Sequence, residues 1–296
     1  MTPDDPEGAT TPDAAAEAPV PFTAVRPSIP RVYGRWQGGR DPHGQWRGGK
    51  DTFAPDRAIA DLVVEKVPGF EDVIWQNWAF LKRAVGHLAK EAGVQQFIDI
   101  GPGLPVDGEP LLPDIARKYQ PEASWLAVDN DQQVLVRWRQ ELDRGDDRLQ
   151  VMFGDLRDPA RILANSQRFL NLSRPTAVLM GAVVHFVLDE DGPADIMRTF
   201  RDTLAPGSRL VLTHATADGA KDDAKAGVKE AAEEYTDAVA RITLRSYDQV
   251  AALLDGWTLR EPGLAKTVDL LVPEDGLIYA ADAPHAWAAV AVVSRE

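Results

Sequence analysis

The sequence predicts an α/β fold in which a mainly parallel sheet carries helices on both faces. From residue 94 onward, short apolar segments alternate with amphipathic helical segments, a pattern typical of repeated strand–helix–strand units. The 296 residues are 44% hydrophobic and 26% charged, which fits a globular protein with a sizeable core. We therefore expect a Rossmann-like, doubly wound, seven-stranded sheet that follows an N-terminal segment of helix and loop.

Charge and composition exclude several classes of partner. The formal net charge of −14 argues against nucleic acid, because phosphate contacts need a dense face of Lys and Arg. No apolar run reaches the roughly 18 residues of a membrane span, and the N-terminus lacks the basic and apolar regions of a secretory signal. The absence of cysteine excludes disulfides and fits a reducing compartment. We expect a cytoplasmic protein without nucleic-acid or membrane partners. The sequence does not decide whether the protein forms a homodimer.

Three regions are expected along the chain. Residues 1–25 are rich in Pro, Ala and acids, which predicts a disordered tail. Residues 26–92 should contain a loop rich in Gly, Arg and Trp (26–57) and then two helices. The loop has more basic than acidic residues, so it is either a solvated surface or a segment that meets an anionic ligand, with Lys50 as a cofactor-binding candidate. Residues 93–296 should form the binding domain, with a helical insertion at about 219–254.

Apolar periodicity places the individual elements. The two N-terminal helices are expected over residues 59–67 and 73–88. The predicted strands cover residues 96–100, 125–128, 149–153, 177–184, 209–213, 257–260 and 286–293. The predicted helices of the binding domain cover residues 113–119, 132–142, 159–169, 194–204, 219–242 and 246–254. The link between the last two strands is too short for an ordinary crossover helix, so we expect them to pair antiparallel at the sheet edge.

The most informative motif follows the first strand, where Asp99 precedes the Gly-x-Gly turn of Gly101 and Gly103. In open α/β sheets a ligand binds outside the carboxyl ends of the strands, and glycines let it approach the backbone closely. A dinucleotide site would need a third glycine where this chain has Val106. Asp99 would repel phosphates but suits a cation such as the sulfonium of S-adenosylmethionine (SAM). These residues therefore favour SAM over NAD(P).

Acidic residues at the ends of the second and third strands complete the expected cofactor site. Asp129 can accept hydrogen bonds from both ribose hydroxyls, with Asn130 beside it. Asp155 can accept from the exocyclic amine of adenine, with Leu156 against the ring. Each acid has an alternative role as a helix cap, although a later acid in the same loop suits that role better.

Two histidines follow the fourth and fifth strands and are candidate bases. His185 and His214 should point into the crevice, where a histidine with a pKa of about 6.5 can take a proton from a nucleophile. Either could equally be a structural hydrogen-bonding group. Ala182, near the end of the fourth predicted strand, is a further candidate for cofactor contact. The sequence has no serine-nucleophile elbow, phosphate-binding loop or metal-spaced histidine pair, so we expect no metal.

Several segments resemble a bacterial family of SAM-dependent methyltransferases that was formerly classed as a domain of unknown function. The similar segments are residues 26–33 (RPSIPRVY), 48–53 (GGKDTF), 77–81 (NWAFL), 99–105 (DIGPGLP), 128–131 (VDND), 155–159 (DLRDP), 185–186 (HF), 210–218 (LVLTHATAD) and 244–246 (LRS). The resemblance implies a class I methyltransferase core, SAM as the cofactor, and an N-terminal segment that folds over the SAM pocket as a lid. Tyr33 in the first segment becomes a third catalytic candidate.

The resemblance defines the methyl acceptor less well than the cofactor. We expect a small molecule, such as a natural product of secondary metabolism. Where the family usually has Thr, this chain has Pro102 and Val106, and an extra ten-residue unit separates Tyr33 from the Gly-Gly-Lys element. Two alternatives therefore stand beside methyl transfer. The protein could use the bound sulfonium without methylating, for example to steer a cyclisation, or it could be a catalytically silent ligand-binding protein.

Overall fold

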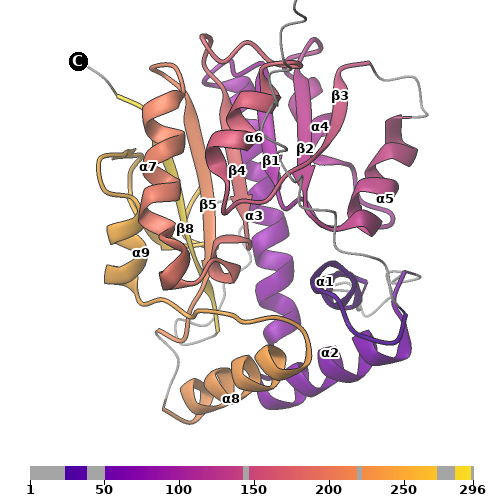
Figure 1. Ribbon diagram of the computed structural model, residues 1–296. Helices are drawn as coiled ribbons and strands as arrows, with labels where there is room; N and C mark the ends of the chain where they lie inside the picture. Colours follow the sequence, from indigo (N-terminus) through magenta and orange to yellow (C-terminus); the bar gives the residue numbers. More distant parts are fainter. Residues whose placement is uncertain (1–23, 39–50, 143–146, 219–221, 272–283, 295–296) are drawn as a thin grey trace, which may run out of the picture.

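The structure of the chain is a computed structural model that describes residues 24–38, 51–142, 147–218, 222–271 and 284–294. Lys50 and nearly all of the predicted N-terminal tail lie outside the described residues. A central sheet has helices on both of its faces, and α1, α2 and α8 gather at one end of it (Figure 1). Within the described residues, no helix combines the length and apolar character needed to cross a membrane.

The central sheet has eight strands in the described part of the chain. They are β1 (Gln96–Ile100), β2 (Ser124–Asp129), β3 (Leu149–Phe153), β4 (Ala177–Gly181), β5 (Arg209–Ala215), β6 (Thr258–Leu259), β7 (Ala265–Lys266) and β8 (Ala286–Val292). The order is β3-β2-β1-β4-β5-β8-β6, and β7 also pairs with β8. The first five strands are parallel, whereas β8 runs antiparallel to β5, β6 and β7. The predicted doubly wound fold with an antiparallel edge is confirmed.

Helices cover the sheet on both faces and close one end of it. They are α1 (Ile29–Gln37), α2 (Ala54–Lys66), α3 (Phe70–Lys90), α4 (Leu112–Arg117), α5 (Gln132–Leu142), α6 (Pro159–Ser166), α7 (Pro193–Thr203), α8 (Asp222–Ala238) and α9 (Tyr247–Leu253), with 3-10 turns at Val184–Phe186 and Asp189–Asp191. Successive residues of a strand point to opposite faces. Accordingly, Phe97 packs in the core beneath α3 and α4, and Ile98 in the core beneath α6 and α7.

Two sequence predictions are wrong in detail. The fourth strand ends at Gly181 instead of residue 184, because Ala182 adopts a left-handed φ of 55° and the chain continues as a 3-10 turn. The predicted loop at 26–57 contains α1 and the start of α2. Pro30 is tolerated in the first turn of α1, and burial of Val32 and Trp36 gives the helix a packed face that propensity alone does not reveal.

A buried ion pair attaches α1 to α2. Arg31 Nε donates to Asp56 Oδ2 over 2.9 Å, and the two side chains are 2% and 0% exposed. The same carboxylate accepts from the backbone N–H groups of Ser28 (3.0 Å) and Phe53 (2.8 Å), which lie at the starts of the two helices. Arg31 Nη1 also donates to Gln133 on α5 over 3.3 Å. Asp56 thus joins the N-terminal helices to each other, and Arg31 connects them to the sheet domain.

Asp56→Ala should therefore destabilise the protein by about 3–5 kcal/mol, because it leaves a buried guanidinium without its counter-ion. The matched control is Asp61→Ala, which removes an exposed carboxylate paired with Arg35. This change should lower the free energy of unfolding by less than about 1 kcal/mol. Urea unfolding followed by circular dichroism measures both. Equal losses for the two variants would contradict the structural role given to Asp56.

Candidate active site

The turn after β1 is held in a conformation that leaves room for a ligand. Gly101 and Gly103 have left-handed φ angles of 66° and 65°. A Cβ on Gly101 would lie 2.7 Å from Val183 Cγ2, whereas a Cβ on Gly103 would meet no described atom within 4 Å. Gly101 N–H donates to Val128 O and Trp138 Nε1 donates to Gly103 O, each over 2.8 Å. The turn is therefore fixed on its inner side and open at Gly103.

Two carboxyl groups lie beside this open position. Asp99 is paired with Ala127 in register, so Asp99 and Asp129 share one face of the sheet. Burial raises the pKa of Asp129 to about 7, although the Asp131 and Gly103 backbone N–H groups favour its ionised form. Burial and then the neighbouring charge of Asp129 raise the pKa of Asp99 to about 7.

Asp99 has an unsatisfied oxygen that suits a ligand. Its side chain is 5% exposed, the Trp125 side chain is the hydrogen-bonding group that favours its ionised form, and Oδ2 accepts no hydrogen bond of normal geometry within the described residues. A buried carboxylate oxygen without a partner is costly, so a cationic or hydrogen-bonding ligand at this turn would stabilise the site.

The predicted adenine-binding pair, Asp155 and Leu156, follows β3. Asp155 accepts from Asn130 Nδ2 (3.0 Å) and from the backbone and side chain of Arg157. Burial raises the pKa of Asp155, but the hydrogen bonds from Arg157 and Asn130 outweigh it and leave the pKa below its ordinary value. Leu156 is 7% exposed and packs in the core. An adenine amine would have to displace a contact of Arg157, whose side chain is 53% exposed.

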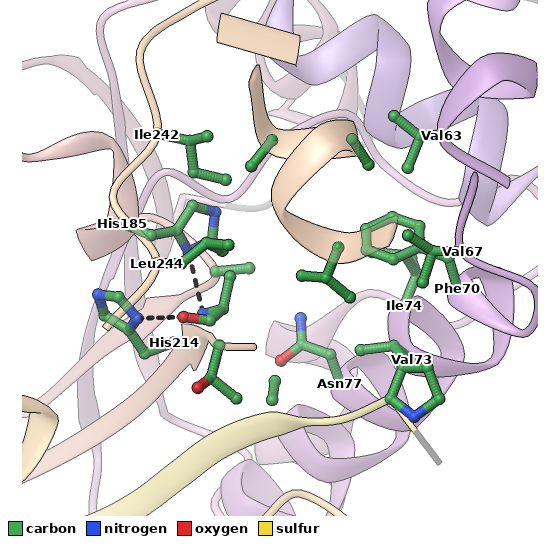
Figure 2. Close-up of a pocket in the computed structure, with 18 of the residues that line it drawn as sticks. Val63, Val67, Phe70, Val73, Ile74, Asn77, His185, His214, Ile242 and Leu244 are labelled. Carbon is green, nitrogen blue, oxygen red and sulfur yellow. Dashed lines mark hydrogen bonds between the residues drawn. The ribbon is translucent and has the colours of Figure 1, made fainter. Parts of the chain in front are cut away.

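A second compartment, separate from the Gly101–Gly103 turn, begins at Ala182, directly after β4. Ala182 N–H donates to Thr213 Oγ1 over 2.8 Å, which fixes the end of β4 against β5. Ala182 also lines a cavity of about 90 Å³ between the carboxyl ends of β4 and β5 and the helices α1, α2, α3 and α8. Figure 2 shows His185 and His214 on one side of the cavity, Val67 and Phe70 on the other, and Asn77 between them.

His185 is buried at this cavity and contacts Tyr33 from α1. The Tyr33 hydroxyl lies 3.2 Å from His185 Nε2, and Ala215 N–H donates to His185 Nδ1 over 3.4 Å. Burial, then His214 and then Arg245, hold the pKa of His185 well below 6.5. Burial raises the pKa of Tyr33, so both groups are neutral at physiological pH. The fold thus joins two predicted catalytic residues that are far apart in the sequence.

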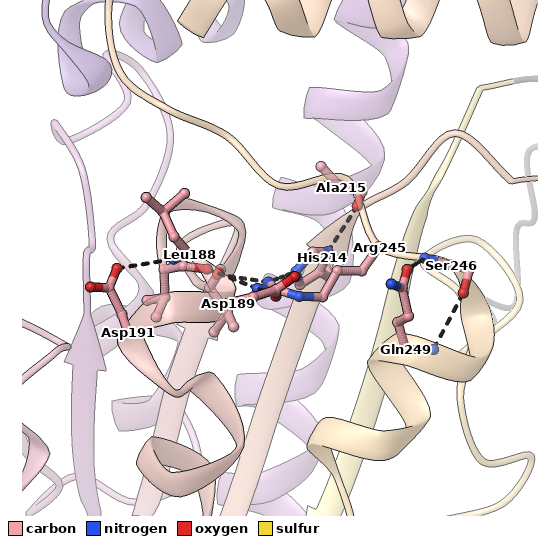
Figure 3. A network of polar contacts seen from close by, with 10 residues as sticks. Leu188, Asp189, Asp191, His214, Ala215, Arg245, Ser246 and Gln249 are labelled. Atoms are coloured by element: carbon pink, nitrogen blue, oxygen red, sulfur yellow. Dashed lines mark hydrogen bonds and ion pairs between the residues drawn. The ribbon is translucent and has the colours of Figure 1, made fainter.

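His214 has hydrogen bonds at both ring nitrogens. Nδ1 donates to Ala215 O over 2.8 Å, and Nε2 accepts from Arg245 Nη1 over 3.0 Å. Burial is the main cause that lowers the pKa of His214 to about 4. Arg245 also donates to Val187 O (2.9 Å) and Asp189 Oδ1 (2.6 Å), which completes the network in Figure 3. This geometry favours the structural alternative for His214.

Sequence reasoning did not assign a function to three residues at the site. Arg245 braces the turn that carries His185, because it donates to Val184 O over 3.3 Å. Asn77 and Tyr235 place polar atoms at the cavity from α3 and α8. Of these three residues, Asn77 could have been identified from the sequence, because it is a polar residue within the apolar stripe of its helix. Within the described ranges, no three His, Asp or Glu side chains gather as a metal site would require.

The sheet order, the open turn at the end of β1 and the acids beside it are those of a Rossmann-like SAM-dependent methyltransferase. Residues 16–295 match the model of the S-adenosyl methyltransferase family, and the chain belongs to this family. SAM is accordingly its cofactor. The buried, unsatisfied oxygen of Asp99 and the open space at Gly103 fit that cofactor.

Two solved structures are similar over most of their length. A DUF574-family protein from Streptomyces avermitilis is 31% identical, with a TM-score of 0.80 over 91% of this chain and 98% of the other. A candidate methyltransferase from Thermobifida fusca is 28% identical, with a TM-score of 0.78 over 90% of this chain and 95% of the other. No curated protein matches the chain.

Asp129→Ala should weaken SAM binding at least about tenfold, because each hydrogen bond to a charged acceptor contributes about 1.5–3 kcal/mol. The control is Asp158→Ala, which removes an acid that caps α6 through Arg161 N–H and should leave SAM affinity unchanged. Isothermal titration calorimetry measures both. Unchanged affinity in Asp129→Ala would remove Asp129 from the cofactor site.

The raised pKa of Asp129 predicts that adenosine, which has no group titrating near neutrality, binds more tightly at pH 8 than at pH 6. Protonation of Asp129 below pH 7 removes the charged acceptor, so the affinity should fall by up to about tenfold over this range. Asp129→Asn should flatten the profile. A wild-type affinity that is constant between pH 6 and pH 8 would contradict a ribose contact to an ionised Asp129.

Proposed function

We propose that this methyltransferase acts on a small molecule, of the kind produced in secondary metabolism, which binds in the cavity next to the cofactor turn. The observation that carries the proposal is the position of the loop after β4. Val183 lies against Gly101 of the cofactor turn, while the preceding Ala182 lines the cavity. A molecule in the cavity would therefore lie next to a cofactor at the turn. Side chains from four helices surround the space, which suits a small acceptor better than a polymer.

Bound SAM supplies an electrophilic methyl group with a neutral thioether as the leaving group. The chain's contribution is to hold the cofactor at Gly103, Asp99 and Asp129 and to place the acceptor in line with it. Positioning of this kind can account for a large share of the rate of a displacement reaction.

We assign Tyr33 to contact with the acceptor and His185 to the positioning of Tyr33. Because Ala215 N–H donates to His185 Nδ1, the neutral ring carries its proton on Nε2 and donates it to the Tyr33 oxygen. The hydroxyl hydrogen of Tyr33 is then available to a substrate atom. In this arrangement His185 has no free ring nitrogen to act as a base, so the proton of the acceptor would leave to water.

The protein is incubated with SAM labelled in its methyl group and with an extract of the cells in which it naturally occurs. The label should be transferred to the fraction of small molecules. Tyr33→Phe should slow this transfer at least about tenfold, since it removes the oriented hydroxyl. Tyr247→Phe is the control, because Tyr247 is 43% exposed and packs against Trp287. Label found only in protein or nucleic acid, or no transfer by an enzyme that binds SAM, would contradict the proposal.

A further inference from the structure

The cavity at the end of β4 and β5 has no acidic side chain, lysine or arginine in its described walls. Four of its titratable side chains are neutral at physiological pH because burial lowers the pKa of His185 and His214 and raises that of Tyr33 and Tyr235. A charged group placed here would lose its hydration without gaining a counter-ion, which is strongly unfavourable.

Aromatic rings form one continuous wall of the cavity. Trp36 lies 5.1 Å from Tyr33, 4.8 Å from Phe70 and 6.1 Å from Tyr235, measured between ring centroids. The Phe186 ring completes the wall, because its centroid lies 6.4 Å from that of Tyr33 and 6.2 Å from that of Tyr235. The rings come from α1, α3, α8 and the turn after β4. A wall of this kind offers stacked and edge-on contacts to a flat ring.

Two polar atoms at the cavity have no hydrogen-bond partner among the described residues. They are Oδ1 of Asn77 and the hydroxyl of Tyr235, on side chains that are 9% and 4% exposed. Figure 2 shows Asn77 projecting into the space from α3. Buried polar groups in native proteins are nearly always hydrogen-bonded, and an unpaired one calls for an explanation. A ligand hydroxyl that donates to Asn77 would supply the missing partner.

We propose that the acceptor is an uncharged aromatic molecule with a hydroxyl group, and that Asn77 recognises this hydroxyl. The inference rests on the proposed function, since it names the class of substrate for the same site. It assigns specificity to Asn77 and Tyr235, whose polar atoms have no hydrogen-bond partner among the described residues. Carboxylates, ammonium compounds and phosphate esters of the same shape should bind more weakly, because no Asp, Glu, Lys or Arg side chain of the described walls can act as their counter-ion.

The first test compares ligands of one shape and different charge. The full-length protein saturated with S-adenosylhomocysteine is titrated calorimetrically with 2-naphthol, 2-naphthoate and 2-naphthylmethylammonium. We expect 2-naphthol to bind at least about tenfold more tightly than either ion, which corresponds to at least about 1.4 kcal/mol. Equal or tighter binding of an ion overturns the proposal, as does failure of 2-naphthol to bind at about 1 mM.

The second test assigns the hydroxyl preference to Asn77. The ratio of the affinities for 2-naphthol and naphthalene is measured in the wild type, in Asn77→Leu and in Asn165→Leu, which makes the same change on α6 away from the cavity. The preference for the hydroxyl should fall at least about fivefold in Asn77→Leu and stay unchanged in Asn165→Leu. If Asn77→Leu does not fold, Tyr235→Phe removes a single oxygen and should reduce the preference. A preference retained in every cavity variant overturns the assignment.

SAM affinity, measured in the same samples, separates this proposal from the proposed function. A wild type that does not bind SAM contradicts the proposed function irrespective of the naphthalene series. Normal SAM binding with no discrimination among the naphthalene ligands contradicts only the substrate class. Normal SAM binding in Asn77→Leu also shows that the cofactor site of the variant is folded.

Discussion

The close packing of Gly101 against Val183 is the constraint on which both halves of the site depend. A side chain at Gly101 would lie in the volume of Val183, so the turn after β1 and the turn after β4 fit together only with glycine at this position. Their contact keeps space open at Gly103 on one side and places Ala182 at the cavity on the other. The proposed cofactor and acceptor positions are therefore set relative to each other by the contact between the Gly101 backbone and the Val183 side chain.

The charges of the two compartments differ in a way that matches the ligands proposed for them. The cofactor side contains Asp99 and Asp129, buried carboxyl groups that suit a cation and its ribose. The proposed acceptor side has aromatic and aliphatic walls, and burial keeps His185 and His214 neutral. Buried cations are used outside the acceptor compartment: Arg31 attaches α1 to α2, and Arg245 supports the turn that carries His185. Ion pairs thus support a cavity that has no Asp, Glu, Lys or Arg in its described walls.

The sheet and the cofactor turn could be predicted from the sequence because their signals are local. The five parallel strands and β8 are short apolar runs, and Asp99, Gly101 and Gly103 lie within five residues of one another. The two-residue strand β7 (Ala265–Lys266) makes eight strands instead of the predicted seven, because it is too short to give an apolar pattern. The cavity could not be predicted, since its walls come from helices whose packing is set by distant contacts such as that between Gly227 and Lys66. For the same reason the sequence predicts a loop where α1 forms: the helix is stabilised by Asp56 and by burial, which no local sequence pattern indicates.

The central claim is that adenosine lies between Gly103 and Asp129 while the reacting end of the cofactor faces the cavity at Ala182. The most direct measurement is a crystal structure of the complex with S-adenosylhomocysteine. The account predicts ribose hydroxyls within hydrogen-bonding distance of the Asp129 carboxylate and a sulfur atom directed toward Ala182. Adenosine density in the apolar cavity, or an Asp129 carboxylate that makes no contact with the ligand, would contradict it.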